Sequence, residues 1–285
     1  TFKVKTHGDL VIVGDMMRSI TLLKYEASTD GPGKLQFVAR DPNAHWIRDV
    51  SFIDDEHYLA HDDAMNTFVM KRAVGVDDAT DESPPLKDQA EFHEGDYINV
   101  FAKGNLNSQP AEHGDVGGGA AGDAVTGYGA SVCLVPDANG MHRSVKFTST
   151  LYGTVSGAIG VIMHIDYDSF RFYSSLEAAI NQCVTSVGEL SHKDWRSTTY
   201  ERRPGTQRNV VDGDAVERFI GLPLEDQENI VSHLNDLLKL TSPSLPPGVS
   251  PVSSSSAVLG SDAPPRPLFT VAEVEARVES MIYLH

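Results

Sequence analysis

The sequence is poor in cysteine and in basic residues. Only two cysteines occur among the 285 residues, Cys133 and Cys183, and neither lies in a C-x-x-C pattern. Two widely separated thiols indicate reduced cysteines of an intracellular protein rather than a disulfide framework. Lysine and arginine number 23 against 40 aspartate and glutamate residues, a formal net charge of -17. Such a surface repels phosphate backbones and argues against a stand-alone DNA- or RNA-binding protein.

Long apolar runs are also absent. No run reaches the length needed to cross a bilayer, and the sequence carries no secretory signal. The chain starts at Thr1 and enters a strand pattern almost at once, which indicates part of a longer protein.

Motifs of catalysis are lacking too. There is no G-x-S-x-G elbow, and the glycine-rich run 114–129 has no lysine and serine or threonine after its last glycine, as a phosphate-binding loop requires. A solvated linker explains that run better. We therefore expect a non-enzymatic protein without a cofactor.

Two acidic or histidine-containing segments invite a metal-site interpretation. The first holds His57, His61, Asp62 and Asp63, whose spacing matches no standard ligand set, so turn residues between strands explain them equally well. The second, 212–214, is shorter than a calcium loop and lacks its distal glutamate, so it indicates a turn and a helix cap. We expect no metal site.

Short apolar runs separated by glycine, aspartate and asparagine fill the chain up to about residue 165. Most alternate or carry β-branched and aromatic residues, a pattern typical of strands. Strands are predicted at 9–13, 19–25, 34–39, 50–53, 67–71, 97–102, 146–155 and 160–165. Many short strands at regular spacing indicate a sandwich, a barrel or a propeller.

The hydrophobic period becomes helical after Asp166. A first helix is predicted from the stripe between Phe172 and Val187, with Asp168 or Ser169 as its cap. Further helices are predicted at 214–221, at about 224–240, and from Thr270 to the end, where Thr270 and Glu273 form a capping box.

Two segments have loop-like compositions. Residues 105–144 are rich in glycine, and residues 241–267 combine four consecutive serines with seven prolines between 241 and 267. Both are predicted to be flexible or disordered.

Several motifs together resemble the C-terminal part of the large subunit of the UV-damaged-DNA-binding protein, the adaptor of cullin-4 ubiquitin ligases. The resemblance is carried by GDMMRS (14–19), AHDDAMNTF (60–68), WRS (195–197), DGD (212–214) and the final TVAEVEARVESMIYLH. The WRS and DGD signatures are shared with the large subunit of the mRNA cleavage and polyadenylation specificity factor and with a splicing factor 3b subunit. GDMMRS and AHDDAMNTF favour the ubiquitin-ligase adaptor.

This resemblance implies a mainly β fold. Residues 1–166 would form the last blades of a seven-bladed β-propeller, and residues 167–285 a small α-helical C-terminal domain. It further implies a protein-interaction scaffold that docks substrate receptors, linked to DNA repair and ubiquitination, in the nucleus and also the cytoplasm. Cullin would bind a propeller absent from this chain, and damaged DNA or RNA would be contacted only indirectly, through a complex.

The resemblance also implies a set of receptor-contacting residues. These are Phe2, Met16, Arg18, Trp46, Tyr97, Asn99 and Val155. Methionines offer an adaptable apolar surface, and an arginine is a common interface hot spot. Ordinary blade packing is the alternative for Trp46 and Val155, and a surface ion pair for Arg18.

The sequence supports two further hypotheses. The alternative function is that of a nucleic-acid-binding subunit of an mRNA 3′-end processing or splicing complex. Separately, Trp195 follows the first predicted helix, where a large aromatic side chain could anchor two elements. We expect it to be buried where the helical domain meets the propeller.

Overall fold

The computed structural model describes most of the chain in separate segments. These are residues 3–29, 31–72, 85–104, 130–136, 142–197, 207–240 and 269–282. Phe2 and the predicted loop 241–267 lie outside the described residues. Residues 105–129 and 137–141 lie outside them as well, so the predicted disorder stays a prediction for these residues and for 241–267, but it is wrong for 130–136 and 142–144, which form strands.

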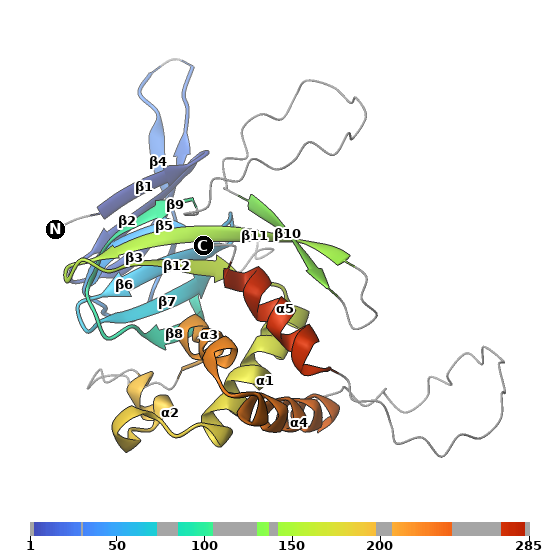
Figure 1. Ribbon diagram of the computed structural model, residues 1–285. Helices are drawn as coiled ribbons and strands as arrows, with labels where there is room; N and C mark the ends of the chain where they lie inside the picture. The colour runs from blue at the N-terminus through green and yellow to red at the C-terminus, as the bar shows by residue number, and fades with distance from the viewer. Residues whose placement is uncertain are drawn as a thin grey trace, which may run out of the picture.

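Twelve described strands form three four-stranded antiparallel sheets (Figure 1). The first sheet contains β1 (Lys3–His7), β2 (Leu10–Asp15), β3 (Ser19–Glu26) and β4 (Lys34–Arg40). The second contains β5 (Ile47–Phe52), β6 (His57–Asp62), β7 (Asn66–Lys71) and β8 (Lys87–His93). The third contains β9 (Ile98–Lys103), β10 (Ala130–Pro136), β11 (His142–Thr154) and β12 (Ile159–His164).

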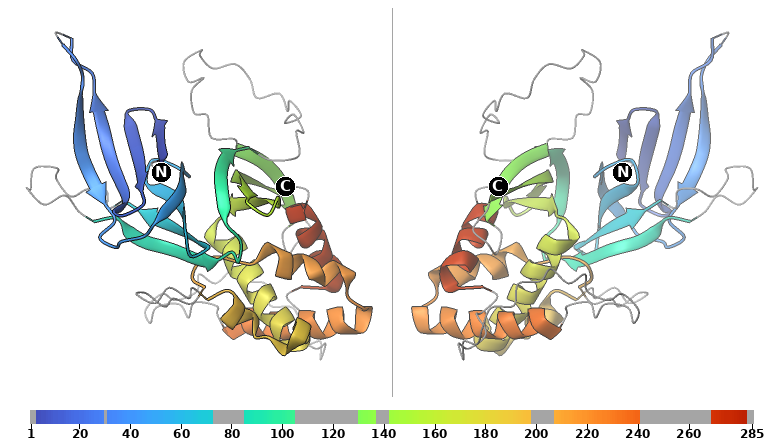
Figure 2. Two further views of the ribbon diagram at one scale, coloured as in Figure 1. Left: turned by 90° about the vertical axis from the view of Figure 1, so that its left-hand side faces the viewer. Right: turned by 90° about the vertical axis from the view of Figure 1, so that its right-hand side faces the viewer.

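The three sheets are arranged like neighbouring blades, each beginning with its innermost strand (Figure 2). The innermost strands β1, β5 and β9 are in contact in that order. Polar groups join them: the Asp49 carboxylate on β5 accepts from the Phe101 amide on β9 at 2.6 Å, and Lys5 on β1 donates to the Phe101 carbonyl at 2.7 Å. The predicted class, propeller blades followed by helices, is confirmed.

An apolar interface joins the first two sheets. Alternate residues of β2 are buried, as expected for a strand with one covered face. Ile12 and Leu22 from the first sheet share a buried cluster with Ile47 and Val50 from the second. Gly14 permits the close approach, because a Cβ there would lie 2.7 Å from the Ile47 side chain.

Helices follow the third sheet and lie beside its end (Figures 1 and 2). They are α1 (Tyr167–Cys183), α2 (His192–Trp195), α3 (Gly213–Glu217), α4 (Leu224–Leu240) and α5 (Val271–Ile282). Their core includes the buried Leu176, Phe219, Leu234 and Val278, with Met163 of β12 packed against it. None of the described helices is both long and apolar enough to span a membrane.

The ends of the long helices test the predicted caps. The capping box is confirmed, since Glu273 accepts from the Thr270 amide at 2.7 Å and donates its own amide to the Thr270 hydroxyl at 3.4 Å. The predicted cap of the first helix is wrong. Asp166 takes that position and accepts from the Ser169 amide at 2.9 Å, because the chain turns into the helix immediately after β12.

Some elements escape the sequence patterns. The last part of the predicted loop 105–144 contains β10 and the start of β11, paired in antiparallel register from Ala130↔Thr148 to Pro136↔His142. The short helix α2 was not predicted. Trp195, at its end, is 51% exposed, so the predicted burial is wrong. Its ring does lie at the junction, edge-on to His93 with centroids 6.0 Å apart, but covers the junction from outside.

Candidate partner-binding rim

Five connections lie at the same end of the three sheets. Antiparallel strands alternate in direction, so the turns after β2, β4, β6, β8 and β11 all fall at the end where the innermost strands begin. We call this set the rim, and it comprises residues 16–18, 41–46, 63–65, 94–97 and 155–158.

Aspartates at strand ends shape most of these turns. Asp15 accepts from the Met17 and Arg18 amides at 2.6 and 3.0 Å, which folds the chain back into β3. Asp62 accepts from the Ala64 and Asn66 amides, both at 2.9 Å. The sequence therefore specifies local turns in which the aspartate side chains bond backbone amides of the same turn.

Hydrogen bonds connect each rim segment to the next. The Ser19 hydroxyl, directly after the first turn, donates to Asp41 at 2.5 Å, and the Asp63 amide donates to the Trp46 carbonyl at 3.0 Å.

The chain of bonds continues across the second and third sheets. The Glu94 amide donates to the Met65 carbonyl at 2.9 Å, and the Val155 amide donates to the Tyr97 carbonyl at 2.9 Å. Ser156 also donates to Asp96, and this hydrogen bond holds the pKa of Asp96 below its ordinary value. The rim is thus one connected surface rather than five independent loops.

The structure brings the predicted contact residues to this end of the sheets, apart from Phe2, which is not described. Met16 is half-buried, while Arg18 and Asn99 are exposed. Exposed fractions are 47% for Trp46, 39% for Tyr97 and 71% for Val155. Trp46 and Val155 are therefore not blade core. The Arg18 side chain forms no ion pair with any residue in the described segments. Their role as contacts remains a prediction.

Arg48 is a rim-side residue that the sequence analysis missed. It is exposed on β5, and its guanidinium carbon lies 5.7 Å from the centre of the Tyr97 ring. Only the adjacency of β5 and β9 brings these two residues together. Since a guanidinium over an aromatic face still offers its edge donors, the rim and the adjacent start of β5 together present two arginines beside aromatic and methionine side chains.

Buried acidic groups lie directly beneath the rim. Asp41 and Asp62 are almost fully buried, and His45 lies between them, with its Nδ1 3.5 Å from the Asp62 carboxylate. Burial raises the pKa of Asp41 despite the Ser19 hydrogen bond, and burial likewise raises the pKa of Asp63. The buried Asp41, His45 and Asp62 support the rim from inside and are not exposed to a partner, whereas Asp63 is only partly buried.

The histidines and aspartates considered as metal ligands have separate structural roles. His57 bonds Asp54 through Nδ1 at 2.9 Å, whereas His61 accepts from the Ile98 amide through Nε2 at 3.0 Å. Burial lowers the pKa of His61 to about 4, so it is neutral as that acceptor role requires. Within the described segments, no group of three or more histidine, cysteine or acidic residues is placed to hold a metal ion.

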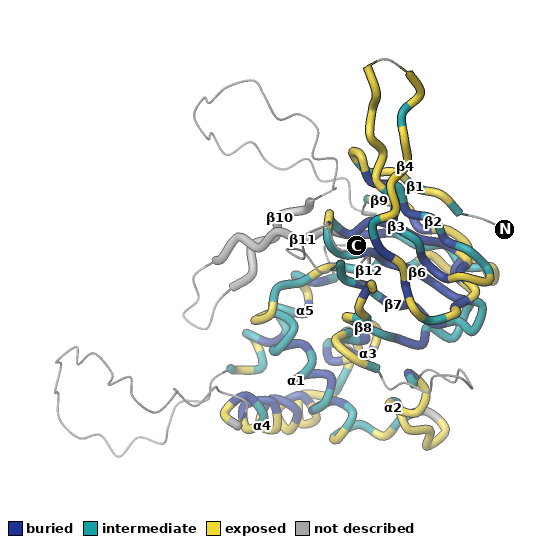
Figure 3. The backbone as a smooth tube through the Cα atoms, turned by 180° about the vertical axis from the view of Figure 1, so that it is seen from behind, coloured by how far each residue is buried: buried dark blue, intermediate teal, exposed yellow. Residues whose placement is uncertain are grey.

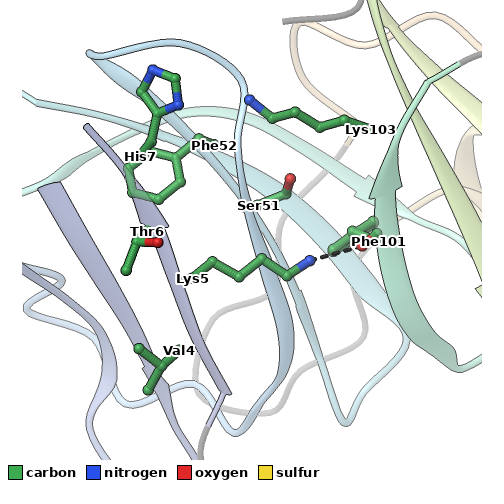
Figure 4. A pocket seen from close by; sticks show the side chains of 8 residues that line it. All are labelled: Val4, Lys5, Thr6, His7, Ser51, Phe52, Phe101 and Lys103. Atoms are coloured by element: carbon green, nitrogen blue, oxygen red, sulfur yellow. Dashed lines mark hydrogen bonds between the residues drawn. The ribbon is translucent and has the colours of Figure 1, made fainter. Parts of the chain in front are cut away.

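An open pocket of about 450 Å³ lies along the innermost strands, away from the rim (Figure 4). It is lined by Val4, Lys5, Thr6, His7, Ser51, Phe52, Phe101 and Lys103. Lys5 points across it to the Phe101 carbonyl and also pairs with Asp49 at 3.4 Å. Its charge therefore joins strands, and no predicted contact residue lines the pocket.

Blades joined through a continuous rim define a propeller-type scaffold. The family model of the CPSF A subunit region matches residues 1–221 of the chain. The chain belongs to this family.

Known relatives show which members of this family the chain is similar to. The chain is 31% identical over 233 residues to DNA damage-binding protein 1a of Arabidopsis thaliana. The matched region covers 81% of this chain and 18% of that protein. It is 31% identical over 228 residues to DNA damage-binding protein 1 of Solanum lycopersicum, covering 80% and 18%. It is 29% identical over 227 residues to DNA damage-binding protein 1 of Oryza sativa subsp. japonica, a match that covers 79% of this chain and 18% of that protein. The chain thus spans 18% of the length of these relatives, and the resemblance inferred from its motifs is confirmed.

Proposed function

We propose that this chain is the receptor-docking part of a cullin-4 ubiquitin-ligase adaptor and has no catalytic role. The observation that carries the proposal is the rim, in which exposed aromatic, methionine and arginine side chains stand on one hydrogen-bonded frame. Tryptophan, tyrosine and arginine are the residues that most often dominate binding energy at interfaces. A rigid frame also lowers the entropy cost of binding.

The partner fitting this surface is a helix of a substrate receptor. Met16 and Met17 adapt to different apolar side chains, while Arg18 can bond an acidic side chain or the carbonyl end of a helix. The names of the relatives, DNA damage-binding proteins, support a role linked to DNA damage. Contact with nucleic acid through a complex, and a location in the nucleus and the cytoplasm, are further parts of this proposal.

The second candidate function is a subunit of an mRNA 3′-end processing or splicing complex. The name of the matching family favours it, since that name refers to the CPSF A subunit. The net charge of -17 and the relatives named as damage-binding proteins weigh against it. Affinity purification of the full-length protein separates the two: recovery of a cullin and its receptors supports the first, and recovery of polyadenylation or splicing factors supports the second.

Arg18→Ala tests the role of the rim directly. In the full-length adaptor we expect receptor binding to weaken by about 1–3 kcal/mol, the hot-spot range. Thermal melting and cullin binding should stay at wild-type level, because Arg18 is exposed and contributes little to the core. Binding constants for a set of purified receptors provide the measurement.

A matched control is Arg218→Ala. Arg218 is also an exposed arginine, but it lies in the helical part of the chain. If both variants bind every receptor as tightly as the wild type, Arg18 is only a surface charge and the proposed role of the rim is wrong.

A further inference from the structure

One buried arginine connects the helical part to the rim. Arg196 follows α2 directly and is only 8% exposed. Its Nε donates to the Asp212 carboxylate at 2.6 Å. From the same guanidinium, Nη1 donates to the carbonyls of His93 at 3.2 Å and Glu94 at 3.1 Å. We call these four residues the Arg196 clamp.

The helical side of the clamp is fixed. Asp212 precedes α3, is 5% exposed, and is bonded by His192 Nε2 at 2.9 Å as well as by Arg196. Burial alone would raise the pKa of Asp212, but the charge and hydrogen bonds of Arg196 and His192 outweigh it and leave that pKa below its ordinary value. The pair is therefore ionised, and its geometry is directional.

The sheet side of the clamp is the start of the rim segment 94–97. The guanidinium stacks on Phe92, with 4.5 Å between its carbon and the ring centre. The Trp195 ring covers Gly95, where a Cβ would lie 2.7 Å from the ring and where φ is +81°. Only glycine fits both conditions readily.

The third sheet holds the same segment from its other side. Glu94 accepts from the Tyr152 hydroxyl at 2.5 Å, and the Tyr97 carbonyl accepts from the Val155 amide at 2.9 Å. Segment 94–97 is thus fixed between the helical part and β11, with the exposed Tyr97 ring at its end.

We propose that Arg196 is a positioning residue, which holds the carbonyls of His93 and Glu94 so that Tyr97 is presented in a fixed orientation to a bound partner. The helical part then acts as a support for the rim and not merely as an appended domain. This inference rests on the proposed function of the rim. It also gives the WRS and DGD signatures a common physical role, since Arg196 and Asp212 meet in space although 16 residues separate them in sequence.

The test compares Arg196→Ala and Arg196→Lys with Arg277→Ala. Arg277 stacks on Phe172 and Phe269 inside the helical core, 4.5 and 4.7 Å from their ring centres, so its loss disturbs the helices without removing a clamp bond. Lysine retains the charge at 196. Its single ammonium group cannot bond both Asp212 and the two carbonyls, as the different nitrogens of the planar guanidinium do.

Two readouts are measured on the full-length protein. Amide hydrogen exchange reports on the opening of residues 94–99. The dissociation constant of a purified cullin-4 substrate receptor reports on the rim. For both Arg196 variants we expect faster exchange in this segment and about tenfold weaker receptor binding, which corresponds to about 1.4 kcal/mol. Arg277→Ala should change neither.

The outcomes separate the two proposals. Unchanged exchange at 94–99 in both Arg196 variants overturns the positioning role. Faster exchange with unchanged receptor affinity supports the positioning of the segment but contradicts Tyr97 as a contact, and hence this part of the proposed function. If Arg196→Ala does not fold, Gly95→Ala displaces the same segment from beneath Trp195 and must produce the same pair of changes.

Discussion

The second sheet meets the first sheet and the helical part in different ways. Toward the first sheet it presents an apolar interface, in which Ile47 and Val50 pack with Ile12 and Leu22. Toward the helical part its outer strand β8 presents hydrogen bonds together with two ring contacts, that of Phe92 with Arg196 and that of His93 with Trp195. There, Arg208 and Glu91 exchange two backbone hydrogen bonds of 2.9 Å, in addition to the Arg196 clamp.

The apolar and the polar contacts differ in how strongly they stabilise the fold and in whether they fix an orientation. Apolar burial is strong but has no direction, so neighbouring sheets are held by volume and shape. Buried ion pairs and hydrogen bonds add little net stability but fix an orientation, because removing one partner leaves the other unsatisfied. The contact between the helical part and the second sheet is therefore oriented by directional bonds, whereas the contact between the first two sheets is held by packing.

The exposure of the strands shows a related contrast. Strands β6 and β7 are mostly buried, whereas the outer ends of β3 and β4 are exposed (Figure 3). Their register pairs Tyr25 with Leu35 and Leu23 with Phe37. Cross-strand pairs of this kind stabilise a hairpin locally, so this hairpin depends less on the interface between the sheets.

The largest expected effect is that of Asp212→Ala. The substitution leaves Arg196 charged and buried without its partner, which should cost about 3–5 kcal/mol of the free energy of unfolding. Urea denaturation of the full-length protein measures this change. A cost below about 1 kcal/mol, the level of surface changes, would show that the polar contact is dispensable and break the contrast.

Leu22→Ala probes the apolar interface. Leu22 is fully buried between the first two sheets, and its truncation should cost about 2–5 kcal/mol through lost transfer energy and a cavity. Denaturation is again the measurement, with hydrogen exchange to locate the loss. Exchange should increase in the first sheet and remain unchanged in the helices. An increase in the helices first would contradict the view that the first sheet and the helical part contact the second sheet independently.

The acid dependence of stability gives a smaller effect. The pKa of Asp212 is lower in the folded state, so its contribution is fully present above the unfolded value of about 3.9 and is lost as pH falls through the folded value. Asp212→Asn should therefore remove part of the fall in melting temperature below about pH 4. Glu177, whose pKa burial raises, acts in the opposite direction at higher pH. If the melting temperatures of the wild type and of Asp212→Asn fall equally with pH below about pH 4, an ionised clamp is contradicted.

The smallest expected effect is that of Trp195→Ala. Because Trp195 is half exposed and the contact of its ring with His93 is edge-on, the cost should be about 0.5–1.5 kcal/mol, the range of an aromatic pair. Thermal melting checks this value. A loss as large as that of Leu22→Ala would restore the sequence-based expectation that Trp195 is core.

Local patterns in the sequence determined much of the fold. Alternation predicted β2, β3 and β7, and the Thr270–Glu273 capping box marked the start of α5, because strand faces and helix caps are decided within a few residues. The motifs identified the family. The sequence also marked Met16, Trp46 and Tyr97 as candidate contacts through resemblance, without showing that they lie on one surface.

Tertiary structure alone decided how these parts meet. Arg48 lies over Tyr97 because β5 and β9 are adjacent, and Arg196 reaches His93 across more than 100 residues of chain. Neither contact has a local pattern, since hydrogen-bond donors and acceptors carry no sequence period when their partners are far apart in the chain. The exposure of Trp195 was decided in the same way, because a side chain at the end of a short helix is buried only if another element covers it.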